Sequence, residues 1–296
     1  MQRNPDQTRP TSTALWGNVV AGLALLALAL SAAPAAAQLN RTMHQDGWIL
    51  AAARAPGLQG SIWRTDLWIH TKSTSGARVE LYFCRSGRDN SDLEGITVTL
   101  EYPRKILYVE DVVEHFLGVG GSSWVGAIHY VASADVQVYA RVYSISADGS
   151  RSYGQVVEGI PTADMSLPVN DPAYPGTDED QWMFAMKHTA DNRYRVNIGV
   201  VNPTAVESPV HVSFFDTTGN FPGGQNHGQT VTVPPYSMIQ LTDPFSGVAG
   251  GEWHDCIARI ETDAAGSGVF GYASVVDNAT NDAYFVRGVK RQRPAG

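Results

Sequence analysis

The chain has 296 residues, a formal net charge of −8 at pH 7 and 43% hydrophobic residues, and it holds two cysteines. A moderately acidic chain has no electrostatic reason to bind nucleic acid, which excludes that class of partner. Two cysteines do not make a disulfide scaffold, so hydrophobic cores must hold the fold together. Cys84 and Cys256 could form a single bridge in an oxidising compartment, and the sequence leaves their state open.

The N-terminal segment predicts export. Residues 1–18 are polar and carry Arg3 and Arg9, a short apolar run follows, and the small residues 35–37 end it. This order is typical of a secretory signal peptide, and the apolar run is shorter than the about 20 residues that span a bilayer. We predict cleavage after Ala37, hence an extracellular or periplasmic protein with no membrane span in the mature chain. An uncleaved N-terminal anchor is the alternative.

Short strands are predicted in close succession from residue 47 onward. The segments rich in β-branched and aromatic residues are "GWILAAAR", "SIWRTDLWIH", "ARVELYFC", "GITVTLEY", "KILYVED", "WVGAIHYVA" and "DVQVYARVYSI". Turn signals rich in Gly, Ser, Asp and Pro separate them. About seven strands in roughly 110 residues, without a clear helical stripe, favour an antiparallel β-sandwich. Only "VEDVVEHFLG" could form a helical turn.

The chain repeats itself, which indicates an internal duplication. A shift of 131 residues lays "RTDLWIH" over "RVNIGVV", and a shift of 133 lays "TVTL" over "TVTV". The matched pairs are Trp48 with Trp182, Val79 with Val210, Phe83 with Phe214, Ile106 with Ile239, Val136 with Val269, Tyr139 with Tyr272 and Ala140 with Ala273. Chance could supply one such block, but not four in order at a nearly constant offset.

The predicted domain boundaries follow this repeat. Four prolines and a run of acids between the two repeats indicate a stiff, extended connector. The predicted segments are a signal peptide (1–37), an N-terminal leader (38–46), a first β-sandwich (47–160), a Pro-rich acidic linker (161–180), a second β-sandwich (181–290) and a C-terminal tail (291–296).

The strand at 61–70 carries an unusual polar row. With a period of two, apolar residues fall on one side, and Arg64, Asp66, Trp68 and His70 fall on the other. The second repeat keeps only the arginine, as Arg195. An indole there could stack on a sugar ring, or it could pack under a loop. If the strand at 137–143 is a neighbour, the candidate ligand-binding residues are Arg64, Asp66, Trp68, His70, Arg141 and Tyr143.

Catalytic and metal-binding patterns are weak. "GGSSWVG" at 120–126 fails G-x-S-x-G, because neither serine has glycines at both required positions. The eight histidines form no H-x-x-x-H or H-E-x-x-H pair. Asp89, Asp92 and Glu94 lack the order of a calcium loop, so a solvated loop is favoured and calcium is the alternative. We predict no catalytic residues, no metal site and no cofactor.

Several motifs resemble a known group of proteins. They are G-x-x-W-R-T-D-L at Gly60–Leu67, the pair Asn202-Pro203, and the "TVTV-PPYSM" block that ends near Asp243. The pattern resembles the tandem Ig-like β-sandwich modules of exported bacterial proteins and covers most of residues 47–290. The first repeat departs from it with Thr71-Lys72 and a longer insert at 85–95. The resemblance implies fold and export, and it implies no activity.

The sequence therefore predicts an all-β protein of two tandem Ig-like antiparallel sandwiches that follow a signal peptide. We expect a non-enzymatic exported protein with a binding, adhesive or structural role in the cell envelope, whose partner is a protein or a glycan at the cell surface. A carbohydrate-binding protein using the Trp68 face is the alternative, and a hydrolase without a recognisable motif is the third reading. Trp68 buried between modules would favour structure, Trp68 exposed beside Tyr143 would favour sugar binding, and a deep cleft with converging acids would favour catalysis.

Overall fold

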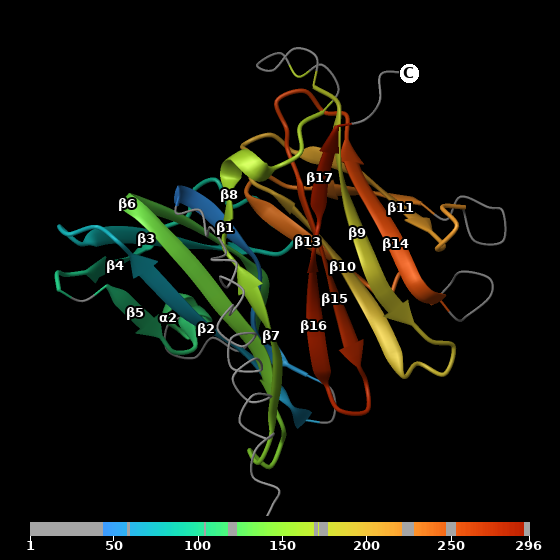
Figure 1. Ribbon diagram of the computed structural model, residues 1–296, viewed down its shortest axis with the longest axis horizontal. Helices are drawn as coiled ribbons and strands as arrows, with labels where there is room; N and C mark the ends of the chain where they lie inside the picture. Colours follow the sequence, from blue (N-terminus) through green and yellow to red (C-terminus); the bar gives the residue numbers. More distant parts are fainter. Residues whose placement is uncertain are drawn as a thin grey trace, which may run out of the picture. The chain divides into compact units, whose positions relative to one another are not determined.

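The computed structural model describes residues 44–292, apart from 58–59, 104, 118–122, 169–170, 172–176, 221–227 and 247–252. These residues form antiparallel β-sheets almost throughout, which confirms the prediction of an all-β sandwich protein (Figure 1). The predicted signal peptide and the last four residues of the predicted C-terminal tail lie outside the described residues.

The first sandwich is built around one long strand. Its elements are β1 (His44–Pro56), β2 (Ile62–Thr71), β3 (Ala77–Arg85), β4 (Ile96–Leu100), β5 (Ile106–Val109), α2 (Val112–Leu117), β6 (Trp124–Ile145), β7 (Ser152–Glu158) and β8 (Ile160–Pro161). The first half of β6 pairs with β3 and β1, and its second half pairs with β2 and β7. One strand thus contributes to both layers, as strands at the corners of sandwiches do. The expected helical turn forms as α2.

The second sandwich repeats this arrangement with separate strands. Its elements are β9 (Glu179–His188), β10 (Tyr194–Asn202), β11 (Ser208–Phe215), β12 (Gln229–Val233), β13 (Ser237–Thr242), β14 (Trp253–Thr262), β15 (Phe270–Asp277), β16 (Asp282–Arg287) and β17 (Val289–Gln292). The sheets run β12-β11-β14-β9-β17 and β13-β10-β15-β16. Strands β14 and β15 occupy the places of the two halves of β6. The first strand of each sandwich pairs with the sixth, so the likeness to immunoglobulin domains lies in the two-layer architecture rather than in strand order.

Strand register agrees between the two sandwiches. Trp68 lies opposite Tyr139 on one side and Tyr108 on the other. At the same place in the second sandwich, Gly199 lies opposite Tyr272 and Gln240. The register also corrects one sequence match. In the first sandwich Ile106 pairs with His70. The counterpart of His70 in the second sandwich is Val201, and it pairs with Met238. Met238, rather than Ile239, therefore corresponds to Ile106.

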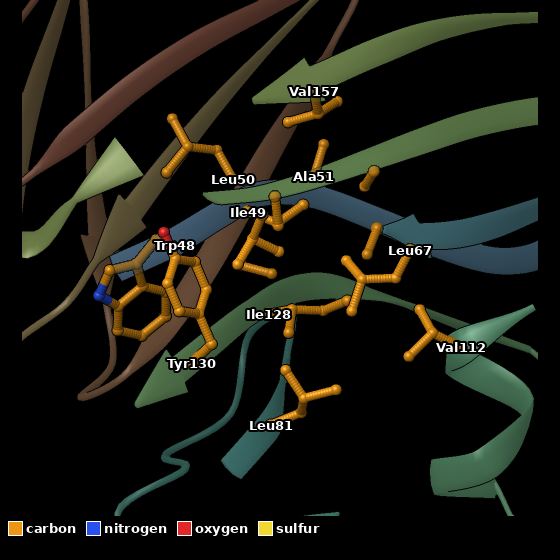
Figure 2. Close-up of a cluster of buried hydrophobic side chains, with 14 of the residues drawn as sticks. Trp48, Ile49, Leu50, Ala51, Leu67, Leu81, Val112, Ile128, Tyr130 and Val157 are labelled. Atoms are coloured by element: carbon orange, nitrogen blue, oxygen red, sulfur yellow. The ribbon is translucent and has the colours of Figure 1, made fainter. Parts of the chain in front are cut away.

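Two hydrophobic clusters form the cores. Figure 2 shows part of the first, with Ile49, Leu67 and Ile128 packed between the strands of the first sandwich. This cluster also takes in side chains of the second sandwich, namely Val201, Met238, Phe270 and Tyr272. The described residues from 44 onward accordingly fall in one compact unit.

The two cysteines are not bridged. Cys84 is buried in the first hydrophobic cluster and Cys256 in the second, and the structure has no disulfide between these two described residues. The bridge that the sequence left open is therefore not formed, because each thiol belongs to a different core. Burial raises the pKa of both thiols to about 12.

The insert at 85–95 fastens the first sandwich to the second, and we call it the strap. Gly87 N–H donates to Met238 O (3.0 Å) and Asn90 N–H donates to Pro235 O (3.1 Å). The buried Asn90 side chain donates to Tyr236 O (2.9 Å), and the Ser237 hydroxyl donates back to Arg85 O (3.0 Å). These bonds tie the strap to the start of β13.

The described part of the predicted linker is also attached to both sandwiches. Strand β8 pairs with β1, a 3₁₀ turn follows at Thr162–Asp164, and Ser166 exchanges backbone hydrogen bonds with Val269 (3.0 and 3.1 Å). These residues are therefore attached to neighbouring strands by backbone hydrogen bonds, and Met165 keeps the extended backbone that was expected of the linker.

Candidate functional site

The polar row of β2 lies on the face of its sheet that points away from the core. Arg64 lies opposite Tyr143 on β6, Asp66 opposite Arg141, and Trp68 opposite Tyr139. The expected adjacency of the strands at 64–70 and 137–143 is thereby confirmed. Alternation along both strands puts these side chains on one face.

An aromatic pair occupies the middle of this face. The ring of Trp68, which is half-buried, lies 5.0 Å from the ring of Tyr108 on β5, at an angle of 34°. Tyr108 is 48% exposed. On the opposite side of Trp68, the hydroxyl of the half-buried Tyr139 donates to Glu158 Oε1 (3.3 Å). We call Trp68, His70, Tyr108, Tyr139 and Arg141 the aromatic face.

Two polar side chains border these rings. The guanidinium of Arg141 lies 4.6 Å from the centre of the Tyr143 ring and donates to Ser152 Oγ (3.1 Å). His70 Nδ1 lies 3.4 Å from Gln137 Oε1. Both side chains are partly exposed, so each can still hydrogen-bond to a ligand that lies on the rings.

Asp66 belongs to a hydrogen-bond network instead of to the surface. It is 5% exposed, and its Oδ1 accepts from the Asp111 backbone N–H (3.0 Å) and the Tyr143 hydroxyl (3.2 Å). Its Oδ2 accepts from the Tyr108 hydroxyl (3.0 Å). Burial and the neighbouring Asp66 carboxylate raise the pKa of Tyr143 to about 12, so this phenol remains a donor at neutral pH.

Asp111 joins this network to two arginines. It lies in the turn between β5 and α2 in a left-handed conformation (φ 42°), and its backbone N–H donates to Asp66. Its carboxylate pairs with Arg54 and lies 3.5 Å from Arg64 Nε. Burial raises the pKa of Asp111, while Arg54 and Arg64 act in the opposite direction. The side chain of Arg64 is therefore held against the fold.

The second sandwich contains a related cluster. Asp243 has the same left-handed backbone (φ 48°) at the end of β13, and His188 Nε2 lies 3.1 Å from its Oδ1. Arg195 interacts electrostatically with Asp243, and Asn197 stands at the place of Asp66. Because both sandwiches keep an Asp–Arg cluster at this corner, the cluster belongs to the architecture of the fold.

The six residues singled out in the sequence thus divide into two groups. Arg64, Asp66 and Tyr143 serve the internal network, whereas Trp68, His70 and Arg141 lie on the aromatic face. Tyr108 was not among the ligand-binding residues predicted from the sequence. Its signal was the period-two pattern of "KILYVED", which puts Tyr108 on one side with Ile106, but the pairing of β5 with β2 cannot be read from that segment alone.

The histidines, the acidic loop and the "GGSSWVG" segment were the other candidates for chemistry in the sequence. Within the described ranges, no group of three or more His, Cys, Asp or Glu side chains could hold a metal ion. Asp89 of the acidic loop accepts from Ser91 N–H (2.9 Å) and Oγ (2.6 Å), which forms a local turn. Residues 120–122 of the "GGSSWVG" segment lie outside the described residues, and its last three residues begin β6. No helix in the described part of the chain has the length and apolarity to cross a membrane.

Comparison with known proteins identifies neither a family nor a function for this chain. No family model matches the chain, and no curated protein matches it. Among solved structures, similarity is found to a chain named BspA_C_WT and to the C-terminal domain of the AgI/II polypeptide BspA of Streptococcus agalactiae. Each has a TM-score of 0.16 and 8% sequence identity, and each match covers 81% of this chain and 100% of the other. A TM-score this low supports neither a shared fold nor a shared function.

Proposed function

We propose that this chain is a non-enzymatic exported binding protein that recognises a surface glycan through the aromatic face of its first sandwich. The observation that carries the proposal is the pair of Trp68 and Tyr108. Two rings from neighbouring strands lie 5.0 Å apart on the outward side of a sheet, and one of them is 48% exposed. Exposed aromatic rings that gather in one place commonly mark a binding surface.

A sugar ring suits this surface chemically. Indole and phenol rings present broad apolar faces, and a pyranose presents a face of C–H groups with hydroxyls around its rim. His70 and Arg141 flank the rings and can bond to those hydroxyls. A few polar groups around an apolar platform fix orientation in small-molecule sites.

The same geometry favours binding over cleavage. Glycoside hydrolysis needs two carboxyl groups that face the scissile bond and exchange protons with it. Both oxygens of Asp66 already accept hydrogen bonds from protein groups, and the Asp111 carboxylate pairs with Arg54. These two acids are therefore engaged in the fold.

The proposal is tested on a glycan array with residues 38–296, Trp68→Ala and Trp182→Ala. Trp182 is a matched control, because it is a half-buried tryptophan of the second sandwich that stacks on Phe215 (5.3 Å). We expect glycan binding by the wild-type chain, its loss in Trp68→Ala and its retention in Trp182→Ala.

A third variant distinguishes the contribution of the Tyr108 ring from that of its hydroxyl group. Tyr108→Phe keeps the platform and removes only the bond to Asp66, so glycan binding should persist. A blank array for the wild type, or loss of binding in Trp182→Ala alone, would contradict the proposal and direct attention to protein partners.

A further inference from the structure

A cavity of about 210 Å³ lies where the first sandwich meets the outward face of β10 and β15. The first sandwich supplies a mostly apolar wall, formed by Ala51, Ala52, Ala53, Ala55, Pro56, Trp63, Val125, Val142 and Gln155. The second sandwich supplies a mostly polar wall, formed by Arg195, Asn197, Gln240, Tyr272, Ser274 and Val276. Such a division between apolar walls and a few polar groups is typical of small-molecule sites.

Two polar atoms in this wall lack partners. Asn197 is 8% exposed, and its Oδ1 is buried without a hydrogen-bond partner among the described residues. The same holds for Nη1 of Arg195, two residues earlier on the same face of β10. A buried polar atom without a partner is costly, so such atoms in the wall of a cavity favour a binding site for a ligand with matching polar groups. Burial lowers the pKa of Arg195, which Asp243 partly opposes.

The first sandwich shows how these positions are satisfied when the protein supplies the partners. There Asp66 accepts from Tyr108, Tyr143 and the Asp111 backbone. In the second sandwich, Gln240 stands at the place of Tyr108 and Val276 at the place of Tyr143. Valine has no donor, and Gln240 Oε1 accepts from Tyr272 (3.3 Å). The second sandwich therefore lacks both tyrosine hydroxyl donors at this position but has an acceptor oxygen there.

A glycine keeps the cavity in its present shape. Gly199 stands where the first sandwich has Trp68, and a Cβ there would lie 1.8 Å from the ring of Tyr272. Because Gly199 has no Cβ, the ring of Tyr272 can lie against the sheet, where Tyr272 is 1% exposed. The remaining neighbours are also engaged, since Ser274 Oγ donates to Gln155 Oε1 (3.2 Å). Among the polar side chains of this wall, Arg195 and Asn197 are the two with a buried side-chain atom that has no hydrogen-bond partner in the described part of the chain.

The unpaired atoms specify complementary chemistry. A guanidinium N–H binds a carboxylate oxygen, and an amide oxygen accepts from a hydroxyl or an ammonium group. Residues i and i+2 of a strand have Cα atoms about 7 Å apart, which suits two groups close together on one small molecule. We propose that the cavity binds a small organic carboxylate that carries a hydroxyl or ammonium group, with its carbon chain against the alanine wall. This site is independent of the glycan proposal.

Isothermal titration of the chain with lactate, alanine, propionate and lactamide tests this assignment. Lactate and alanine hold both groups, propionate lacks the second, and lactamide lacks the charge. We expect binding of lactate or alanine, and weakening by about tenfold or more for propionate and lactamide, because each leaves one buried protein group unpaired.

Variants locate the binding in the cavity. Arg195→Met should abolish it, and Asn197→Asp, which places a fixed carboxylate beside Arg195, should abolish it without removing the arginine. Arg193→Met is the matched control, since Arg193 is an exposed neighbour that pairs with Asp277 (2.7 Å) outside the cavity. Binding should be unchanged in this control. No heat from any of the four compounds, or equal binding by wild type and both cavity variants, would overturn the proposal.

Discussion

Two equivalent sheet faces in this molecule have different surroundings. On β2 the face carries Trp68 between Tyr108 and Tyr139, and Tyr108 is 48% exposed. On β10 the same positions hold Gly199 between Gln240 and Tyr272, and Tyr272 is 1% exposed. The backbone register is the same. Side chains on the same arrangement of strands therefore decide whether a face stays open to solvent or packs against the other sandwich.

On the other outward face of each sandwich, formed by β1 and β9, the difference in burial is reversed: the first sandwich is covered and the second is more open. Trp48 on β1 is fully buried in the first cluster, which includes Met238 of the second sandwich, and its ring stacks on His129 (4.6 Å). Its counterpart Trp182 on β9 is half-buried beneath Arg259 and Arg291, whose guanidinium groups lie 5.8 and 5.6 Å from its ring. Each sandwich thus buries one outward face and exposes the other.

The largest expected effect separates the buried tryptophan from the exposed one. Trp48→Ala should lower the free energy of unfolding by about 3–5 kcal/mol, because it leaves a large void in a packed core. Trp68→Ala removes a half-exposed ring and should cost about 1 kcal/mol or less. Urea unfolding of both variants measures the difference, and similar losses for the two would show that Trp68 is also a core residue.

A smaller effect is expected from the glycine that distinguishes the covered face. Gly199→Ala places a Cβ against the Tyr272 ring, so it should destabilise the chain by about 1–3 kcal/mol through overpacking. In a Tyr272→Ala background the same change should cost little, because the obstructing ring is gone. Additive losses in this double-mutant cycle would show that the cost has another origin.

The strap should contribute comparably to the contact between the sandwiches. Asn90→Ala removes an amide that donates to Arg85 O, Arg88 O and Tyr236 O, so about 1–3 kcal/mol should be lost from the free energy of unfolding. Ser91→Ala changes an exposed neighbour in the same loop and serves as control. Equal stability of the two variants would mean that the strap does not fasten the sandwiches.

The smallest effect is a shift in one titration. Asp66 raises the pKa of Tyr143, so Asp66→Asn should lower that pKa from about 12 toward the value near 10 of an ordinary tyrosine. The sign follows because a neutral amide no longer repels the phenolate. Burial remains, so the shift should be partial. Tyrosinate absorbance during an alkaline titration reports it, and an unchanged or higher pKa would show that Asp66 does not act on Tyr143.

Local patterns were sufficient to predict the sheets. Period-two alternation at 61–70 separated Leu67 and Ile69, which are buried, from Trp68 and His70, which are partly exposed on the aromatic face. The repeat offset of 131 residues put Arg64 on Arg195, and the strand pairings agree with that match. We propose that this agreement in register reflects a duplication of one ancestral sandwich.

Long-range packing explains what the sequence could not supply. The strap was visible only as an insert, because its partners lie about 150 residues further along the chain, at 235–238. The sequence predicts Asp66 as a ligand-binding residue, because the left-handed turn at Asp111, which brings a backbone N–H to Asp66, has no strong local signal. The cavity at Arg195 requires contact between two sandwiches, and no single strand pattern encodes that contact.

Hydroxyl-radical footprinting of the native chain tests the difference between the two faces most directly. Trp68 and Tyr108 should be oxidised several-fold faster than Tyr272, with Trp48 protected and Trp182 intermediate, when rates are read by mass spectrometry and normalised to the unfolded chain. That order would establish that the β2 face is open and the equivalent β10 face is covered. Equal oxidation rates for Tyr108 and Tyr272 would contradict the account.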